Sequence, residues 1–272
     1  IEAIGYRVVL TDQVLARDGF FAGEHAARTA ALLACLEDPT VRAVFCARGG
    51  YGSNYVVEQL SSRSILNRLQ RLTPKIVMGY SDATSLLLFL NETLGWVAFQ
   101  GPMLTKDFAS GETGYNRSVM EHVLGNFTRG TNLETDAQTL RPGSAEGRLA
   151  GGCLSLLTAT LGTPQEIDTK GTILLLEDVD EKPFRIDRML FQLRRAGKFR
   201  DIRAVAFGEM PGCGLAAPPV EALHEVILDA FADQDIPIVF GLRFGHNTGR
   251  CLTLPLGVRA RLDAGDKVTL TL

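Results

Sequence analysis

Short apolar segments alternate with helix-like segments along the first half of this 272-residue chain, and this alternation limits the folds open to it. The segments that predict strands are Tyr6–Leu10, Val41–Cys46, Lys75–Gly79 and Val97–Phe99, and those that predict the intervening helices are Glu24–Leu36, Ser53–Leu60 and Ala83–Leu94. Strands separated by helices imply crossover connections and a parallel sheet with helices on both faces. Ligands of such sheets bind at the carboxyl ends of the strands.

The second half predicts a separate unit of strands and helices. Residues 126–145 are polar, contain Gly130 and Pro142-Gly143, and predict a linker. After it come apolar strands near residues 148–152, 172–176 and 204–207, helices near 154–161, 183–196 and 220–232, and four short closing strands. The length suits two domains or one large one, and the change in composition favours two. We therefore expect one domain at 1–125, a linker at 126–145 and a second domain at 146–272.

Charge and cysteine usage narrow the class of protein. The net charge is −3, which attracts neither nucleic acid nor an anionic membrane. No apolar run approaches the ~20 residues that span a bilayer. The five cysteines are odd in number and lack a Cys-x-x-Cys pair, so they predict neither a disulfide framework nor a zinc site. With no signal-peptide pattern either, the expectation is a cytoplasmic protein without metal or cofactor.

The turn Gly79-Tyr80-Ser81-Asp82-Ala83 joins a predicted buried strand to a predicted apolar helix. A serine at such a turn presents its hydroxyl above the sheet, as in a nucleophile elbow. The N–H groups that open the helix favour negative charge at the same place. The usual elbow has glycine two residues after the serine, where this chain has Ala83. The alternative is that the serine or the aspartate simply caps the helix.

A serine nucleophile needs a base, and His246 is the histidine best placed to supply one. His25, His122 and His224 fall within predicted helices. His246 lies in the glycine-flanked loop Phe244–Gly249, and loops on rigid scaffolds are where catalytic groups concentrate. The alternative is a turn histidine satisfied by local backbone groups.

The base in turn needs a carboxylate, and the apolar strand Ile173–Leu176 runs directly into Glu177 and Asp178. A carboxylate at the end of a buried strand costs free energy unless it is paired or belongs to a site. The two side chains point to opposite faces, and either could orient His246. The alternative is that one of them caps the helix from Pro183 or pairs with an arginine of that helix.

The loop Arg48-Gly49-Gly50-Tyr51-Gly52-Ser53 follows a strand and opens a helix. It matches neither the phosphate-binding nor the dinucleotide-binding glycine pattern. Its glycines allow backbone N–H groups to approach a substrate carbonyl closely, which favours an oxyanion hole.

These elements recur, in order, in a known family. The segments that carry the likeness are 45–53, 74–82, Gly101-Pro102-Met103, 151–157, 176–190, Phe244-Gly245-His246 and Leu254-Pro255-Leu256-Gly257. Over about Gly5 to Leu272 the chain resembles the LD-carboxypeptidase family, the serine peptidases that include muramoyltetrapeptide carboxypeptidase and the microcin C self-immunity peptidases. Two departures stand out: Cys153 replaces a common Asn, and the family's apolar strand and helix ahead of Tyr6 are missing from this sequence.

The resemblance implies a fold and a catalytic set. The fold is α/β, with an N-terminal Rossmann-like parallel sheet domain and a C-terminal α/β domain containing a swivelling, barrel-like mixed sheet. The triad falls on Ser81, Glu177 and His246, which selects Glu177 over Asp178. The implied oxyanion hole consists of the backbone N–H of Asp82 and of the Gly49–Gly50 loop.

The implied activity is removal of the terminal D-alanine from murein tetrapeptide in cell-wall recycling, by a homodimer. A carboxypeptidase must bind a free carboxylate, for which arginine is well suited; the candidate substrate-binding residues are Arg48, Tyr51 and Arg185. Two alternatives stay open. One is a related serine peptidase that hydrolyses a peptide-nucleotide antibiotic of the microcin C type, and the other is a non-catalytic small-molecule binder.

Overall fold

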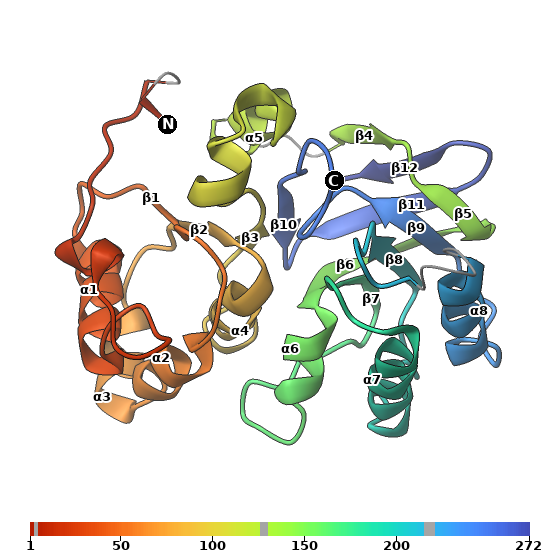
Figure 1. Ribbon diagram of the computed structural model, residues 1–272, viewed down its shortest axis with the longest axis horizontal. Helices are drawn as coiled ribbons and strands as arrows, with labels where there is room; N and C mark the ends of the chain where they lie inside the picture. Colours follow the sequence, from red (N-terminus) through yellow and green to blue (C-terminus); the bar gives the residue numbers. More distant parts are fainter. Residues whose placement is uncertain (3–4, 126–129, 215–220) are drawn as a thin grey trace.

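The computed structural model describes residues 1–2, 5–125, 130–214 and 221–272, which form two sheets lying side by side (Figure 1). In chain order, residues 1–125 contain α1 (His25–Glu37), β1 (Ala43–Phe45), α2 (Ser53–Leu60), α3 (Arg63–Leu69), β2 (Ile76–Gly79), α4 (Thr84–Leu88), β3 (Ala98–Gln100) and α5 (Arg117–Leu124). Residues 130–272 contain β4 (Asn132–Thr135), β5 (Gln138–Arg141), β6 (Gly143–Cys153), α6 (Leu154–Ala159), β7 (Thr172–Glu177), α7 (Pro183–Arg195), β8 (Ala204–Gly208), α8 (Glu221–Ala230), β9 (Ile238–Leu242), β10 (Leu254–Leu256), β11 (Arg259–Ala264) and β12 (Val268–Thr271).

The smaller sheet has the strand order β1-β2-β3-β10, and β1, β2 and β3 run parallel. Successive residues of β2 face opposite cores. Val77 packs into the core that α1, α2 and α4 share, whereas Met78 meets Phe99 and, from α5, Val119. Helices therefore cover both faces, which confirms the prediction of a parallel sheet built from crossovers.

The predicted strand at Tyr6–Leu10 is wrong. These residues contain no strand, and Figure 1 shows this part of the chain running outside the sheet. Val9 and Leu10 are 58% and 66% exposed. A strand is stabilised by the ladder it shares with a neighbour, and no described strand pairs with this segment. Apolar composition alone could not supply that neighbour.

The larger sheet has the order β4-β12-β11-β6-β7-β8-β9-β5. Its centre, β6 to β9, is parallel, and antiparallel strands flank it on both sides. α6, α7 and α8 lie along one face of it (Figure 1), over the apolar cluster that includes Leu174, Leu176 and Phe207. This curled mixed sheet confirms the predicted barrel-like second half.

Two features of the second half differ from the sequence prediction. Residues 132–141 form β4 and β5, paired with β12 and β9, where a linker was expected. They are edge strands in which most of the described side chains are only partly buried, so their composition is polar although Leu133 is buried. Residues 126–129 of that linker, and the first residue of the helix predicted at 220–232, lie outside the described residues. The division into two domains stays a prediction.

β10 is the strand that brings the two sheets together. It follows β9 of the larger sheet in sequence, yet it pairs antiparallel with β3 of the smaller sheet, with Leu254 opposite Gln100. In Figure 1 it lies between the sheets. The segment that leads to it, residues 243–253, therefore crosses from one sheet to the other and carries His246.

Among the residues that the structure describes, no helix combines the length and apolar character that crossing a bilayer requires.

Candidate active site

Ser81 stands in a strained turn between β2 and α4. β2 ends at Gly79, a 3-10 turn covers Ser81–Ala83, and α4 follows at Thr84. The φ angle of Ser81 is 61°, a left-handed conformation that is uncommon for residues other than glycine. Such strain persists where the surrounding structure enforces it, and it is characteristic of the nucleophile elbow. Ser81 is half-buried, while Asp82 beside it is buried.

Glu177 and His246 form a close pair. Glu177 is the last residue of β7 and is fully buried. Its Oε2 lies 2.7 Å from the ring Nδ1 of His246 and accepts the backbone N–H of His246 at 2.8 Å. A carboxylate on Nδ1 holds the imidazole in the orientation and tautomer that leave Nε2 free to act as a base.

Gly245 allows the loop to pass directly over this carboxylate. Its φ is +64°, and a Cβ built on it would collide with the carboxyl carbon of Glu177. The glycine that flanks His246 in the sequence is thus required by the close approach of the loop to Glu177.

Asp178 has a different role. Its Oδ2 accepts the backbone N–H of Ser155 at 2.8 Å, at the start of α6, so it caps that helix. The two carboxylates that the residues alone left as alternatives therefore separate: Glu177 faces His246, and Asp178 binds a helix N-terminus.

Gln100 of β3 and Tyr80, the residue after β2, both contact the pair, and sequence reasoning missed both. Gln100, fully buried at the end of β3, points its Nε2 toward Glu177 Oε1 at 3.5 Å. The buried ring of Tyr80 stands edge-on to the His246 ring, with centroids 5.1 Å apart. Gln100 could have been found, because it is a polar residue ending an apolar strand at the sheet edge where ligands bind. The contact of Tyr80 has no local sequence signal.

The Tyr80 contact places the imidazole beside the residue that precedes Ser81. Among the hydrogen bonds of the described residues, none joins the Ser81 hydroxyl to His246 or to another group. Bonds between nucleophile and base are often long until substrate binds. The structure thus pairs Glu177 with His246 and places the His246 ring beside the turn that carries Ser81.

The glycine loop lies against Ser81. A Cβ built on Gly49 would be 2.8 Å from Ser81 Cβ and 2.9 Å from Ser81 Oγ. Gly50 has φ +130°, a conformation that side chains rarely adopt. The backbone at Gly49 therefore approaches the serine hydroxyl more closely than a residue with a side chain could.

Gly49→Ala is expected to lower kcat/KM by about 100-fold, because its methyl group must displace either Ser81 or the loop whose N–H groups are predicted to form the oxyanion hole, and an oxyanion donor contributes on this scale. The measurement is hydrolysis of a D-alanine-ended peptide by the purified variant. Gly265→Ala is the matched control, since the nearest atom to its new Cβ would be 3.9 Å away and it lies in a turn of the larger sheet. Equal loss in both variants, or none in Gly49→Ala, would contradict the placement of the loop.

The three predicted substrate-binding residues lie in two places. Arg48 and Tyr51 flank Gly49 and Gly50; Arg48 donates Nε–H to the Gly49 carbonyl at 3.2 Å, and Tyr51 is 50% exposed. Arg185 is in the first turn of α7 and forms an ion pair with Glu181 at 2.6 Å. Arg48 and Tyr51 are thus on the loop that contacts Ser81, whereas Arg185 is paired with Glu181 on α7.

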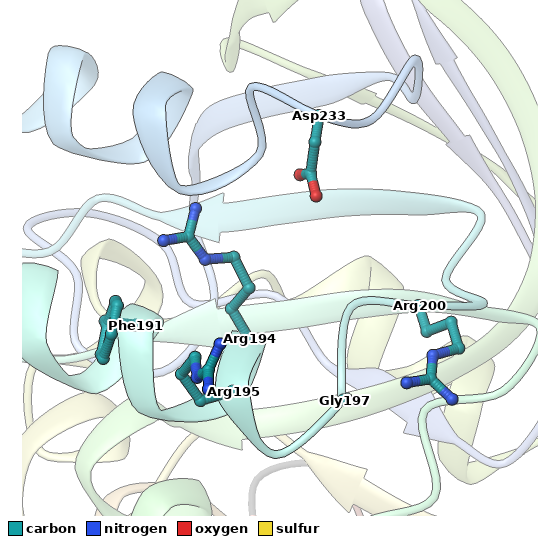
Figure 2. A pocket seen from close by; sticks show the side chains of 6 residues that line it. All are labelled: Phe191, Arg194, Arg195, Gly197, Arg200 and Asp233. Carbon is teal, nitrogen blue, oxygen red and sulfur yellow. The ribbon is translucent and has the colours of Figure 1, made fainter.

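A hollow of about 450 Å³ lies elsewhere, at the C-terminal end of α7 (Figure 2). Arg194, Arg195 and Arg200 line it, with Asp233 from the segment after α8. Figure 2 shows that the three guanidinium groups do not converge. None of the predicted site residues lines this hollow.

Within the described ranges there is also no cluster of three or more His, Cys, Asp or Glu residues that could hold a metal ion.

Comparison with known proteins decides the family. The family model described as LD-carboxypeptidase N-terminal domain matches residues 1–101, and the model described as LD-carboxypeptidase C-terminal domain matches residues 146–262. The chain belongs to the LD-carboxypeptidase family. The family likeness predicted from the ordered motifs is thereby confirmed, and with it the assignment as a serine-type carboxypeptidase.

Relatives in this family span nearly the whole chain. A protein of Bacillus subtilis (strain 168) named "Probable murein peptide carboxypeptidase" is 35% identical over 277 residues, covering 99% of this chain and 84% of the relative. The crystal structure of muramoyltetrapeptide carboxypeptidase from Oxalobacter formigenes is similar with a TM-score of 0.83 and 29% identity, over 99% of this chain and 90% of that one.

A further solved structure is the microcin C7 self immunity protein MccF in complex with aspartyl sulfamoyl adenosine. Its TM-score is 0.82 at 24% identity, over 98% of this chain and 87% of that one. At this identity the likeness concerns the fold alone.

Proposed function

We propose that this enzyme removes the terminal D-alanine from murein tetrapeptide, with Ser81 as nucleophile, His246 as base and Glu177 as the acid that orients the base. The observation that carries the proposal is the Glu177–His246 pair, held at 2.7 Å next to the strained turn of Ser81. Relatives named as a murein peptide carboxypeptidase and a muramoyltetrapeptide carboxypeptidase support murein peptides as the substrate class.

The proposed reaction begins with attack of Ser81 Oγ on the carbonyl carbon before the terminal D-alanine. His246 Nε2 takes the hydroxyl proton, and the buried Glu177 stabilises the imidazolium that forms. The tetrahedral oxygen, now negative, accepts hydrogen bonds from the backbone N–H of Asp82 and of the Gly49–Gly50 loop.

The intermediate then collapses. The C–N bond breaks, His246 returns its proton to the leaving amine, and D-alanine departs, leaving an acyl-enzyme on Ser81. A water molecule, deprotonated by His246, attacks the ester, and the tripeptide leaves with a new carboxylate. Arg48, Tyr51 and Arg185 are proposed to bind the substrate, with arginine pairing its free carboxylate.

The second candidate function is hydrolysis of a peptide-nucleotide antibiotic, which the fold shared with MccF favours. A substrate panel separates the two. We expect murein tetrapeptide to be hydrolysed with kcat/KM about 100-fold above that of aspartyl sulfamoyl adenosine, a difference of about 2.7 kcal/mol in transition-state binding. The reverse order would favour the antibiotic substrate.

The same panel tests the non-catalytic alternative. If a fluorophosphonate does not label Ser81, neither compound is turned over and the protein nevertheless binds one of them tightly, the non-catalytic binder is favoured. We also propose a cytoplasmic homodimer that serves cell-wall recycling; light scattering of the purified protein measures the oligomeric state.

A further inference from the structure

We infer that the carboxylate of Asp82 is a positioning residue that fixes the Gly49–Gly50 oxyanion donors relative to Ser81. The inference rests on the proposed serine mechanism and adds to it. In that mechanism Asp82 contributes only its backbone N–H, whereas its side chain here holds the other half of the same hole.

The side chain of Asp82 crosses from the nucleophile's turn to the glycine loop. It is 6% exposed. Its Oδ1 accepts the backbone N–H of Gly52 at 3.2 Å, and its Oδ2 accepts both the backbone N–H of Ser53 at 2.9 Å and the Ser53 hydroxyl at 2.7 Å. Three donors from one short segment thus converge on a single carboxylate.

Those donors open helix α2. Gly52 is its N-cap residue and has no side chain with which to cap the helix. Asp82 therefore supplies the cap from another part of the chain, in the position where a negative charge interacts favourably with the helix dipole. The helix start and the nucleophile's turn become one unit.

The remaining contacts make this unit tight. The Arg28 guanidinium donates to the Gly52 carbonyl at 3.0 Å, so Gly52 is bound through both its N–H and its C=O. Gly50 is two residues away, and Gly49 lies against Ser81. The loop is thus fixed at its far end by Asp82 and meets Ser81, the residue before Asp82, at its near end.

The charge of Asp82 is more than a cap requires. Neutral Asn and Ser cap helices about as well as Asp, and a buried charge carries a desolvation cost that a neutral residue avoids. Among the ion pairs of the described residues, none involves Asp82. A charged acceptor forms shorter and stronger hydrogen bonds, which suits a group whose task is to hold backbone donors in place.

The test is Asp82→Asn, measured on a step that uses the oxyanion hole and on one that does not. When a fluorophosphonate reacts with Ser81, His246 takes the hydroxyl proton, an oxygen–phosphorus bond forms, the phosphorus–fluorine bond breaks with loss of fluoride, and the phosphoryl oxygen occupies the hole. We expect the second-order labelling rate and kcat/KM to fall together by about 10- to 100-fold. Affinity for murein tripeptide, the product, is expected to stay within about twofold, because a ground-state ligand does not need the donors.

Two further variants keep the result interpretable. Ser53→Ala removes only the hydrogen bond from the Ser53 hydroxyl to Asp82, so the labelling rate and kcat/KM are each expected to fall about threefold. This variant tests the inference even if Asp82→Asn does not fold. Thr172→Val is the structural control. It removes a buried hydrogen bond of 2.8 Å to the Thr169 carbonyl at the start of β7, the end away from Glu177. We expect it to lower the melting temperature without changing the labelling rate or kcat/KM.

The outcomes are distinct. Loss of stability in Asp82→Asn with both rates unchanged would make Asp82 a cap only and overturn the inference, as would a weaker tripeptide affinity with an unchanged labelling rate. Unchanged rates in Ser53→Ala would do the same if Asp82→Asn is unfolded. Absence of labelling at Ser81 in the unsubstituted protein would instead refute the proposed function, whatever the Asp82 variant does.

Discussion

Ser81→Ala is expected to leave a folded protein whose release of D-alanine from murein tetrapeptide is reduced by roughly four to six orders of magnitude. The proposed mechanism has no other group that can form the acyl-enzyme. Within the described part of the chain the Ser81 hydroxyl makes no hydrogen bond, and alanine has the same Cβ at φ 61°. The free energy of unfolding is therefore expected to change by less than about 0.5 kcal/mol.

The measurement combines turnover with thermal unfolding of the same samples. Ser61→Ala is the matched control: Ser61 follows α2, and its hydroxyl donates to the Val57 carbonyl at 2.7 Å, away from the glycine loop. That variant should retain full turnover. Turnover by Ser81→Ala at the unsubstituted rate would show that another residue is the nucleophile.

Glu177→Gln is expected to lower kcat by about 10⁴-fold while leaving the fold intact. A glutamine oxygen can still accept the two His246 N–H groups that Glu177 Oε2 binds at 2.7 and 2.8 Å. It cannot stabilise the imidazolium of the transition state, because it carries no charge. Since Glu177 is fully buried, replacing its charge with a neutral amide also removes a desolvation cost. Unfolding is therefore expected to occur at the same or a higher temperature.

A large loss of kcat with an unchanged or raised unfolding temperature distinguishes a catalytic role of Glu177 from a structural one. Glu92→Gln is the control, because Glu92 is also a largely buried carboxylate but pairs with Arg148 at 3.0 Å. Burial raises the pKa of Glu92, and Arg148 partly opposes that effect. Its substitution removes the ion pair with Arg148 and is expected to leave kcat unchanged. A loss of stability with normal kcat in Glu177→Gln would contradict the role of Glu177.

The local patterns were sufficient to predict β2, which leads to Ser81, and α2, which follows the glycine loop. α2 begins and ends at the predicted residues, and β2 lies within the predicted strand. These segments have a clear apolar periodicity and glycine or serine at their ends, so short-range physics decides them. The turn with Ser81 between β2 and α4 follows from the same signals.

The elements that were not predicted correctly depend on pairing with strands that are distant in the sequence. β10 pairs with β3, a contact between residues 254 and 100 that no local pattern contains. β4 and β5 are polar because they are edge strands, so their composition predicted a linker. Tyr6–Leu10 has the composition of a strand but no described partner.

The candidate site shows the same limit. The residues alone could not separate Glu177 from Asp178, since both follow one buried strand and alternate in direction. The family resemblance selected Glu177, and in the structure it is Glu177 that meets His246, while Asp178 caps α6. The side-chain contacts of Asp82 and Gln100 became visible only once the sheets were assembled.

The most direct test of the central claim is mass spectrometry of murein tetrapeptide incubated with the protein and, in parallel, with Ser81→Ala. We predict that the unsubstituted protein converts the tetrapeptide to tripeptide with release of one D-alanine per molecule, and that Ser81→Ala releases none. An intact tetrapeptide with the unsubstituted protein, cleavage at another bond, or equal release by both proteins would contradict the claim.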